Sequence, residues 1–438
     1  MNSVIREAYN KCRPEQFIQY GDSRYVDFSA QHLRGSGEDI FRTVETTIGL
    51  SDAPGLHLLS GHIGSGKTTE LKQMEHRLQQ AGYQVVYIDT ECFLNLSMPA
   101  TVLELWVAIA AGLEASLSAD DRFGAALARI GSRINAALTS VIDMKTKLSA
   151  LGAEVEFTPR ANPDLFEQID THLGQMRPKL IQECQTYVEE AIAKLRHADP
   201  RPVVLMIDSF EKVRGNASNE VEVRRSVESL FTRDWPLLQS PPCHTVMLVP
   251  PWLSFTLAGG AGNIGPIPVL PVVKVQNADR TAYEPGIEAV VGLVRKRLDI
   301  EALFGDVEPV RRLVAESGGF IRDLLRLLQS VLRAAASEGI SLPMEPAWLA
   351  DRSERAILEL RDTYDMALDA DDGPLYAAID ENHDVAALNR EDRFRVAGLF
   401  DHHVVLCYQN GSQWFALHPL VRATKTVQLA LTRSEPPS

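Results

Sequence analysis

Cysteine is scarce in this chain, and no cysteine has a close partner in the sequence. The five cysteines are scattered over 438 residues, at Cys12, Cys92, Cys184, Cys243 and Cys407. This spacing fits reduced thiols rather than a disulfide framework, and it supplies no paired metal ligands. The N-terminus also lacks the apolar core of a signal peptide, so we expect a cytoplasmic location.

Long apolar runs without charge are missing as well. The best candidate, residues 100–117, contains Glu104 and Glu114, so we expect no membrane-spanning helix. An excess of positive charge is also absent, because 44 Lys and Arg residues face 58 Asp and Glu residues. A net charge of −14 does not steer the whole chain toward nucleic acid. A nucleic-acid partner stays an alternative that this charge disfavours, since it would need a local basic patch.

The first 280 residues carry the pattern of a parallel α/β sheet. Short apolar segments predict five strands, at residues 56–59, 83–89, 203–208, 245–249 and 269–274. A helix predicted at 68–80 joins the first two strands into a βαβ unit. The interval 90–202 is predicted to be mostly helical, at 102–118, 122–151 and 162–197. That is more helix than one crossover needs, and we interpret it as an insertion projecting from the sheet.

The last third of the chain is mostly helical. Helical periodicity runs from 284 to 368, and the polar run at 370–374 marks a boundary. Two strands are predicted beyond it, at 404–408 and 414–417, and Asn410-Gly411 between them is a strong hairpin signal. Helices followed by a hairpin are typical of a winged-helix domain.

A glycine-rich turn between the first predicted strand and its helix carries the main chemical signal. It reads Gly61-His62-Ile63-Gly64-Ser65-Gly66-Lys67-Thr68, followed by Thr69. This is the P-loop pattern in its proper strand–helix context. We expect the loop's main-chain N–H groups to surround the phosphates of ATP or GTP, with Lys67 reaching the β- and γ-phosphates and the Thr68 hydroxyl holding Mg²⁺. The positions expected to bind the nucleotide are Gly61, Gly64, Ser65, Gly66, Lys67, Thr68 and Thr69, while no role is assigned to His62.

Acidic residues follow the third predicted strand. Asp208 ends that strand, where a second carboxylate on the magnesium side is expected, usually acting through water. A base for the attacking water is also needed, and Glu211 is the first candidate, with a surface turn residue as the alternative. Asp89 and Glu91 are weaker candidates, for which helix capping is the better interpretation.

Two further stretches carry a resemblance to a known class. Asp208-Ser209-Phe210-Glu211 resembles the second acidic motif of STAND ATPases, which are ATP-switched signal-transduction proteins. The segment Ser317-Gly318-Gly319-Phe320-Ile321-Arg322-Asp323-Leu324-Leu325 is similar to the lid motif of AAA+ proteins of the origin-recognition type. Residues 24 to 335, and loosely the C-terminal region, therefore resemble the AAA+ and STAND branch of P-loop ATPases.

The resemblance implies roles and domain boundaries. Arg322 would sense the γ-phosphate from the lid. Arg233 would be an arginine finger if the protein is a homo-oligomer in which it acts on a neighbouring copy, and a plain surface arginine is the alternative. Tyr25-Val26-Asp27 and Arg34-Gly35 resemble the segment that lines the adenine pocket. The expected domains are an N-terminal lead-in and adenine-side segment at 1–50, a P-loop α/β core at 51–280 with its insertion at about 100–200, a helical lid at 281–370, and a winged-helix-like domain at 371–438.

The chain also departs from the class. The fourth strand ends in Val249-Pro250-Pro251-Trp252, without the polar sensor of AAA+ proteins or the Thr-x-Arg of many STAND proteins. The residue after Asp208 is Ser209 rather than glutamate. Nucleotide binding is thus better supported than hydrolysis, and the choice between the two groups stays open.

Three functions remain after these observations. The leading hypothesis is a magnesium- and ATP-dependent conformational switch that acts on a protein effector on another chain; such relatives are common in bacterial antiviral defence. The second is a nucleic-acid-associated AAA+ loader or remodeller, although residues 361–438 hold 12 acidic and 7 basic side chains. The third is a nucleotide-binding scaffold that does not turn over.

Overall fold

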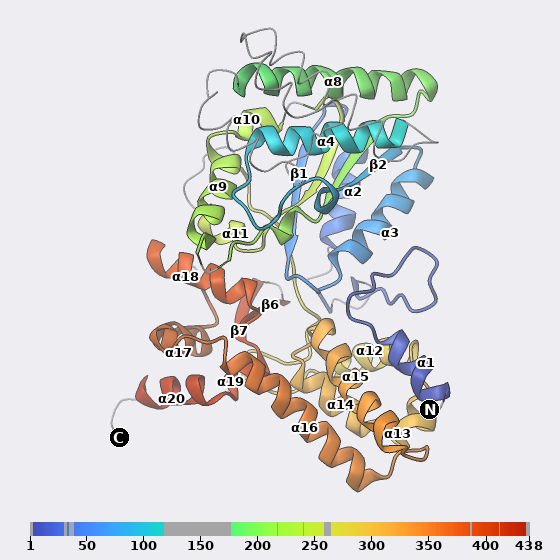
Figure 1. Ribbon diagram of the computed structural model, residues 1–438, viewed down its shortest axis with the longest axis vertical. Coiled ribbons are helices and arrows are strands. Elements are labelled where there is room, and N and C mark those ends of the chain that lie inside the picture. The colour runs from blue at the N-terminus through green and yellow to red at the C-terminus, as the bar shows by residue number, and fades with distance from the viewer. Residues whose placement is uncertain are drawn as a thin grey trace, which may run out of the picture.

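Figure 1 shows the computed structural model, in which an α/β layer lies above a helical bundle and a small C-terminal domain. The structure describes residues 3–29, 33–34, 39–117, 177–216, 218–239, 241–257, 264–385, 388–410 and 412–434. Among these residues, no helix combines the length and the apolar character needed to cross a bilayer.

Five parallel strands form the central sheet, in the order β2-β3-β4-β1-β5. The strands are β1 (Leu56–Gly61), β2 (Gln84–Asp89), β3 (Val203–Asp208), β4 (His244–Leu248) and β5 (Val269–Leu270). All five predicted strands are therefore present, and they are parallel because helices return the chain over the sheet faces.

Helices cover both faces of this sheet. One face packs on α2 (Ile40–Leu50) and α3 (Lys67–Gln80), in a buried cluster that includes Leu59, Val204 and Leu71. The other face is covered by α4 (Val102–Leu117), α8 (Arg177–Ala198) and α9 (Glu220–Thr232), with the short helices α10 (Trp235–Leu238) and α11 (Leu253–Thr256) beyond them. Successive strand residues alternate between the two clusters, as the pleat requires.

The described ends of the predicted insertion pack on the sheet. Helix α4 contacts β2 and α8 contacts β3, and the two helices lie against each other (Figure 1). These segments act as a normal covering layer. The predicted helix at 122–151 and the first part of the one at 162–197 lie outside the described residues.

Strand β5 is shorter than the predicted 269–274. Pro271 follows it and has no N–H group to donate to a ladder. Beyond that point the backbone pairs elsewhere: the Val272 N–H donates to the Cys407 carbonyl at 3.0 Å, and the Lys274 N–H donates to the Leu33 carbonyl at 3.0 Å. The segment after β5 thus joins the sheet to the C-terminal domain.

The lid region is a helical bundle, as predicted. It consists of α12 (Glu284–Arg295), α13 (Ile300–Phe304), α14 (Glu308–Glu316), α15 (Ile321–Glu338) and α16 (Pro346–Asp365). The sequence did not predict α1 (Ser3–Lys11), which packs on α15. The N-terminal residues therefore belong to the lid bundle as well as to the core.

The C-terminal domain has the predicted helices followed by a hairpin. After the lid bundle come the short helix η5 (Ala370–Asp372), α17 (Gly373–Asn382), α18 (Arg390–Asp401), β6 (Val405–Asn410), β7 (Ser412–Leu417), α19 (Pro419–Arg422) and α20 (Lys425–Ser434). Strands β6 and β7 pair antiparallel from Val405–Leu417 to Asn410–Ser412. Gly411 of the hairpin signal lies outside the described residues.

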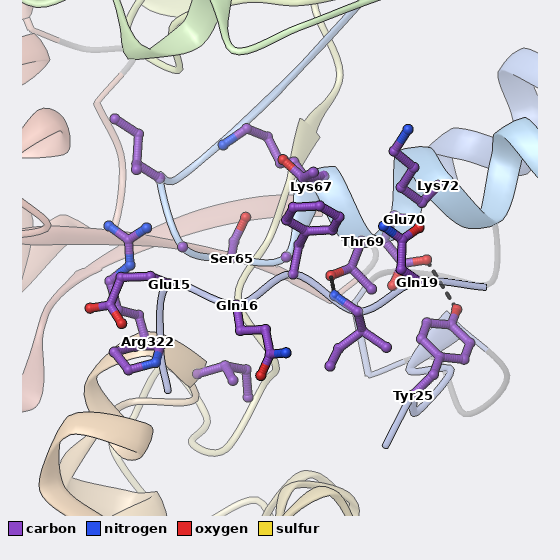
Figure 2. Close-up of a pocket in the computed structure, with 18 of the residues that line it drawn as sticks. Glu15, Gln16, Gln19, Tyr25, Ser65, Lys67, Thr69, Glu70, Lys72 and Arg322 are labelled. Atoms are coloured by element: carbon purple, nitrogen blue, oxygen red, sulfur yellow. Dashed lines mark hydrogen bonds between the residues drawn. The ribbon is translucent and has the colours of Figure 1, made fainter. Parts of the chain in front are cut away.

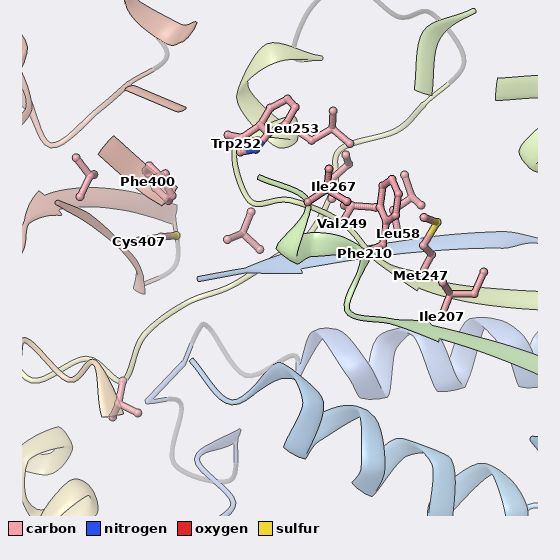
Figure 3. Packing of buried hydrophobic residues seen from close by; sticks show 14 of the residues in the cluster. Leu58, Ile207, Phe210, Met247, Val249, Trp252, Leu253, Ile267, Phe400 and Cys407 are labelled. Carbon is pink, nitrogen blue, oxygen red and sulfur yellow. The ribbon is translucent and has the colours of Figure 1, made fainter. Parts of the chain in front are cut away.

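One buried apolar cluster runs from the sheet into the C-terminal domain. Figure 3 shows part of this cluster, from Leu58 and Met247 of the sheet, past Trp252, to Phe400 and Cys407 of the C-terminal domain. Phe400 contacts Phe255 of α11, with ring centroids 4.7 Å apart. The C-terminal domain is therefore docked on the α/β core by apolar packing.

Candidate functional site

The glycine-rich loop lies where the sequence predicts it, between β1 and α3 (Figure 2). Gly64 and Gly66 have φ values of 99° and 98°, a left-handed backbone that favours glycine. Gly66 is the N-cap of α3, and no side chain caps it. The unpaired N–H groups and the dipole of this helix end are suited to bind an anion.

Lys67 is buried beneath the loop. Its Nζ donates to the carbonyls of Gly61 at 2.8 Å and His62 at 2.9 Å, and lies 3.6 Å from Glu211 Oε1. Burial lowers the pKa of this ammonium, while the carboxylates of Glu211 and Asp208 oppose the shift. The loop, the lysine and the acidic motif are thus brought together.

Asp208 lies at the end of β3, and its two oxygens have different partners. Oδ1 accepts from the Ser209 N–H at 2.7 Å and from the Thr68 hydroxyl at 3.5 Å. Oδ2 accepts from the hydroxyl of Tyr87 on β2. The Thr68 hydroxyl and the carboxylate are oxygen ligands of the type that Mg²⁺ prefers. The residues therefore fit a magnesium ion at this place.

Glu211 is brought inward by an unusual turn. Ser209 has a φ of 68°, and the short helix η4 (Phe210–Lys212) follows it. Only 4% of Glu211 is exposed, and its Oε2 atom has no hydrogen-bond partner among the described residues. Burial raises the pKa of this carboxyl, while Lys67 opposes the shift. A surface position, the alternative left open by the sequence, is wrong.

Arg322 reaches the loop from the lid. A Cβ on Gly64 would lie 2.5 Å from its Nε atom, so glycine is what lets the guanidinium approach the loop. Burial lowers the pKa of Arg322. The lid motif also needs its own glycines, because a Cβ on Gly319 would lie 1.8 Å from the Val273 carbonyl oxygen. The lid thus packs in close contact with both the glycine-rich loop and the segment after β5.

A cavity of about 360 Å³ lies between the core, the lid and the N-terminal segment. Its lining includes all loop residues from Ile63 to Thr69, together with Asp208, Glu211 and Arg322. Gln16 and Tyr25 come from the N-terminal segment (Figure 2). Gly61 lies just outside this lining, at the end of β1.

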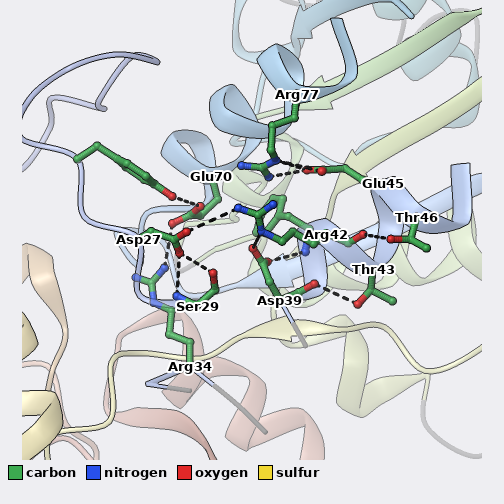
Figure 4. A network of polar contacts seen from close by, with 12 residues as sticks. Asp27, Ser29, Arg34, Asp39, Arg42, Thr43, Glu45, Thr46, Glu70 and Arg77 are labelled. Carbon is green, nitrogen blue, oxygen red and sulfur yellow. Dashed lines mark hydrogen bonds and ion pairs between the residues drawn. The ribbon is translucent and has the colours of Figure 1, made fainter. Parts of the chain in front are cut away.

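The two N-terminal stretches expected near the base both touch α3 (Figure 4). The Arg34 Nη2 donates to the Ser65 carbonyl at 2.7 Å, and its Nη1 lies 3.5 Å from Glu70 Oε1. The Tyr25 hydroxyl donates to the other Glu70 oxygen at 3.1 Å. Tyr25, Val26 and Arg34 line the cavity, whereas Asp27 does not and Gly35 lies outside the described residues.

Of three other predicted residues, Asp89 lines the cavity, whereas Arg233 and Glu91 do not. Arg233 bonds Asp234 at 3.0 Å, has a side chain that is 65% exposed, and does not line the cavity. It could act only on a neighbouring copy, so the arginine finger stays a prediction. Asp89 accepts from the Glu91 N–H at 3.1 Å, and Glu91 pairs with Lys212 at 2.6 Å, which agrees with the capping interpretation.

Two residues at the site were not predicted, Tyr87 and His62. Tyr87 holds Asp208, as described above. His62 Nε2 accepts from the Cys407 N–H of β6 at 3.2 Å, and its ring stacks on Phe400 of α18 with centroids 4.7 Å apart. Burial lowers the pKa of His62 to about 3, so the ring is neutral and can accept this bond. Both contacts join residues far apart in the sequence, and no local motif indicates them.

Fold and site together define a P-loop α/β core with a parallel five-stranded sheet, a helical lid and a C-terminal winged-helix-like domain. No protein-family model matches the chain, and no curated protein matches it.

Solved structures similar to the chain include the Aeropyrum pernix ORC2 protein in ADPNP and ADP complexes, with 11% identity, 98% of both chains covered and a TM-score of 0.41. Cdc6p from Pyrobaculum aerophilum is similar at 11% identity, covering 97% of this chain and 98% of the other, with a TM-score of 0.40. The Aeropyrum pernix ORC1 protein in complex with DNA shares 14% identity over 94% and 96% of the two chains, with a TM-score of 0.39. The nucleotides and DNA in those structures are ligands of those proteins. With identities of 11–14% and TM-scores of 0.39–0.41, the similarity does not assign these ligands to this chain.

Proposed function

We propose that this protein is an ATP-binding and ATP-hydrolysing conformational switch that controls a separate protein partner. One observation carries the proposal: the P-loop touches the winged-helix domain directly, through His62, Phe400 and Cys407. A structural change in the P-loop on binding or loss of the γ-phosphate would therefore act directly on the C-terminal domain, without an intervening helix or strand.

Nucleotide binding is supported by the loop geometry and charge. A triphosphate would lie against the N-terminus of α3, and Lys67 would exchange the Gly61 and His62 carbonyls for phosphate oxygens. Magnesium would neutralise phosphate charge, and Thr68 with Asp208 would hold it, directly or through water. The nucleobase of the bound nucleotide would lie toward the N-terminal segment that carries Gln16 and Tyr25.

Hydrolysis is supported by Glu211 and Arg322. A buried carboxyl with a raised pKa is a suitable general base, because its proton affinity is closer to the working pH. Arg322 approaches the same loop from the lid and can bind the γ-phosphate. Loss of that phosphate would release the arginine and, with it, the lid.

Three contacts would carry this change into the winged-helix domain. His62 of the P-loop accepts a hydrogen bond from the backbone of β6. Arg214, three residues after Glu211, donates from its Nη2 to the Asp401 carbonyl of α18. The Tyr408 hydroxyl donates to the Gly318 carbonyl of the lid motif at 2.6 Å. These contacts start in the P-loop, three residues after Glu211 and four residues before Arg322. The domain therefore contacts the P-loop, the segment after the acidic motif and the lid motif.

The switch can be tested by hydrogen exchange with and without MgATP. ATP should change the protection of β6 and β7 in the wild type, and His62→Ala should lose most of this response while still binding ATP. His57→Ala is the matched control, because His57 lies at the opposite end of β1 and bonds His244 at 3.3 Å. Equal responses in all three proteins would refute the proposed route.

Turnover needs a separate experiment. Steady-state ATPase rates of the wild type, Lys67→Ala and Glu211→Gln distinguish the switch from a scaffold that does not hydrolyse. The switch predicts that both variants lose at least about 100-fold, a typical effect of removing a base or a charge stabiliser. Equal rates in all three would favour the scaffold.

The nucleic-acid loader remains the second candidate, because an AAA+ core is here combined with a winged-helix domain. The helix before the wing, α18, faces the core: Arg224 of α9 bonds its Asp401 side chain at 3.1 Å and its Phe394 carbonyl at 3.0 Å. DNA binding through α18 would need this contact to open. Salt-dependent DNA binding, at low and physiological salt, tests this candidate, and undetectable affinity at low salt would exclude it.

A further inference from the structure

The carboxylate of Asp208 is held in one rotational state by a side chain outside all recognised motifs. Its Oδ2 accepts from the Tyr87 hydroxyl, while Oδ1 accepts from the Ser209 N–H and faces the Thr68 hydroxyl. The two oxygens are therefore not equivalent. Only Oδ1 lies beside the other expected magnesium ligand.

The sheet register explains why Tyr87 reaches Asp208. Parallel strands β2 and β3 pair Asp89 with Asp208 and Tyr87 with Met206. Residues two apart in a strand point to the same face, so Tyr87 and Asp208 share a face of the sheet. That is the face covered by α3, and Lys72 Nζ of α3 lies 3.1 Å from the centroid of the Tyr87 ring. Strand and helix thus fix the tyrosine ring between them.

A tyrosine suits this place because it is a neutral donor. An arginine or lysine at Oδ2 would fix the carboxylate but would also neutralise the charge that attracts a cation. The hydroxyl of Tyr87 is an uncharged donor, and it is directed at Asp208 Oδ2. The hydroxyl therefore orients the carboxylate and leaves its negative charge available.

We infer that Tyr87 is a positioning residue for magnesium: it holds Asp208 so that Oδ1 and the Thr68 hydroxyl face the same ion. This inference rests on the proposed nucleotide site. It assigns no contact between Tyr87 and the nucleotide. Residues that orient metal ligands commonly change metal affinity by about 10- to 100-fold when they are removed.

The test compares Tyr87→Phe with wild type in a binding assay that needs no turnover. ATP binding is measured by calorimetry in EDTA and then over a series of Mg²⁺ concentrations. Tyr87→Phe should raise the Mg²⁺ concentration for half-maximal enhancement of ATP binding by about tenfold or more, and leave binding in EDTA unchanged. Mn²⁺ spectroscopy of the ATP complex should show weaker manganese binding in the same variant.

Tyr83→Phe is the matched control, since Tyr83 precedes β2, does not line the cavity and directs its hydroxyl to the Ile48 carbonyl at 3.5 Å. It should behave as wild type. An unchanged Mg²⁺ midpoint in Tyr87→Phe would overturn the inference, and so would an equal loss of ATP binding with and without Mg²⁺, which indicates a merely structural role. Failure of the wild type itself to bind ATP would instead refute the proposed function.

Discussion

The buried pair of Lys67 and Glu211 makes a quantitative prediction about folding stability. Their side chains are 2% and 3% exposed, and the ammonium lies 3.6 Å from the carboxylate. Lys67→Met would leave the Glu211 charge buried without its cation, which costs about 3–5 kcal/mol in comparable pairs. The variant would also lose two hydrogen bonds to carbonyls, worth about 1 kcal/mol each.

The sign of the pH dependence follows from Glu211. Its pKa is raised in the folded protein, so the folded state binds more protons than the unfolded state between the unfolded and the folded pKa. Stability must then fall as pH rises through that window. Lys67→Met removes the positive charge that opposes the rise in the pKa of Glu211. The pH range in which stability falls therefore extends to higher pH. The variant should therefore lose more stability at pH 8 than at pH 6.

A double-mutant cycle isolates the pair. Lys67→Met/Glu211→Gln has no buried charge at these two positions, so at pH 8 it should be more stable than Lys67→Met alone by about 2 kcal/mol and nearly insensitive to pH in this range. Urea unfolding followed by circular dichroism gives the values. Lys212→Met is the control, because its pair with Glu91 is exposed and should contribute less than about 1 kcal/mol. No recovery in the double variant, or a pH-independent Lys67→Met, would refute the reasoning.

Two further predictions concern the loop and the exposed arginine. Gly64→Ala should lower ATP affinity at least about tenfold in calorimetry, because the new Cβ clashes with Arg322 and the backbone at Gly64 is left-handed. Gly82→Ala is the control: Gly82 has a similar φ of 92° but open space around it, so this variant should lose only about 1 kcal/mol of stability to backbone strain. Arg233→Ala should leave ATP binding unchanged and should lower turnover only at protein concentrations where copies assemble, as measured by ATPase rate against concentration; a loss of ATP binding at high dilution would contradict this.

Local patterns were sufficient to predict most of the fold. The P-loop, the five strands and the terminal hairpin each depend on residues close together in the sequence, such as Gly64 to Thr68. The end of β5 was mispredicted because the segment after Pro271 exchanges sheet bonds for the Cys407 and Leu33 backbones. Helix α1 was missed because its packing partner, α15, is some 300 residues away, and helix packing rather than propensity decides such a short helix.

The candidate site combines residues that motifs predict with contacts between distant parts of the sequence. Lys67, Thr68, Asp208 and Arg322 were all placed by their motifs, and the cavity brings them together. His62 occupies a variable position of the P-loop pattern, so its meaning depends on the winged-helix domain that it touches. That contact is 345 residues away in the sequence and could not be derived from spacing.

The turn after β3 bears on whether the protein hydrolyses ATP. Glutamate is missing directly after Asp208, and this absence was one reason to consider a scaffold that does not turn over. The left-handed Ser209 and the short helix η4 instead bring Glu211 to Lys67, and both residues line the cavity. An acid two positions later thus lies beside the P-loop lysine. The scaffold hypothesis keeps its other support, because β4 runs into Val249 and Pro250, which offer no polar side chain.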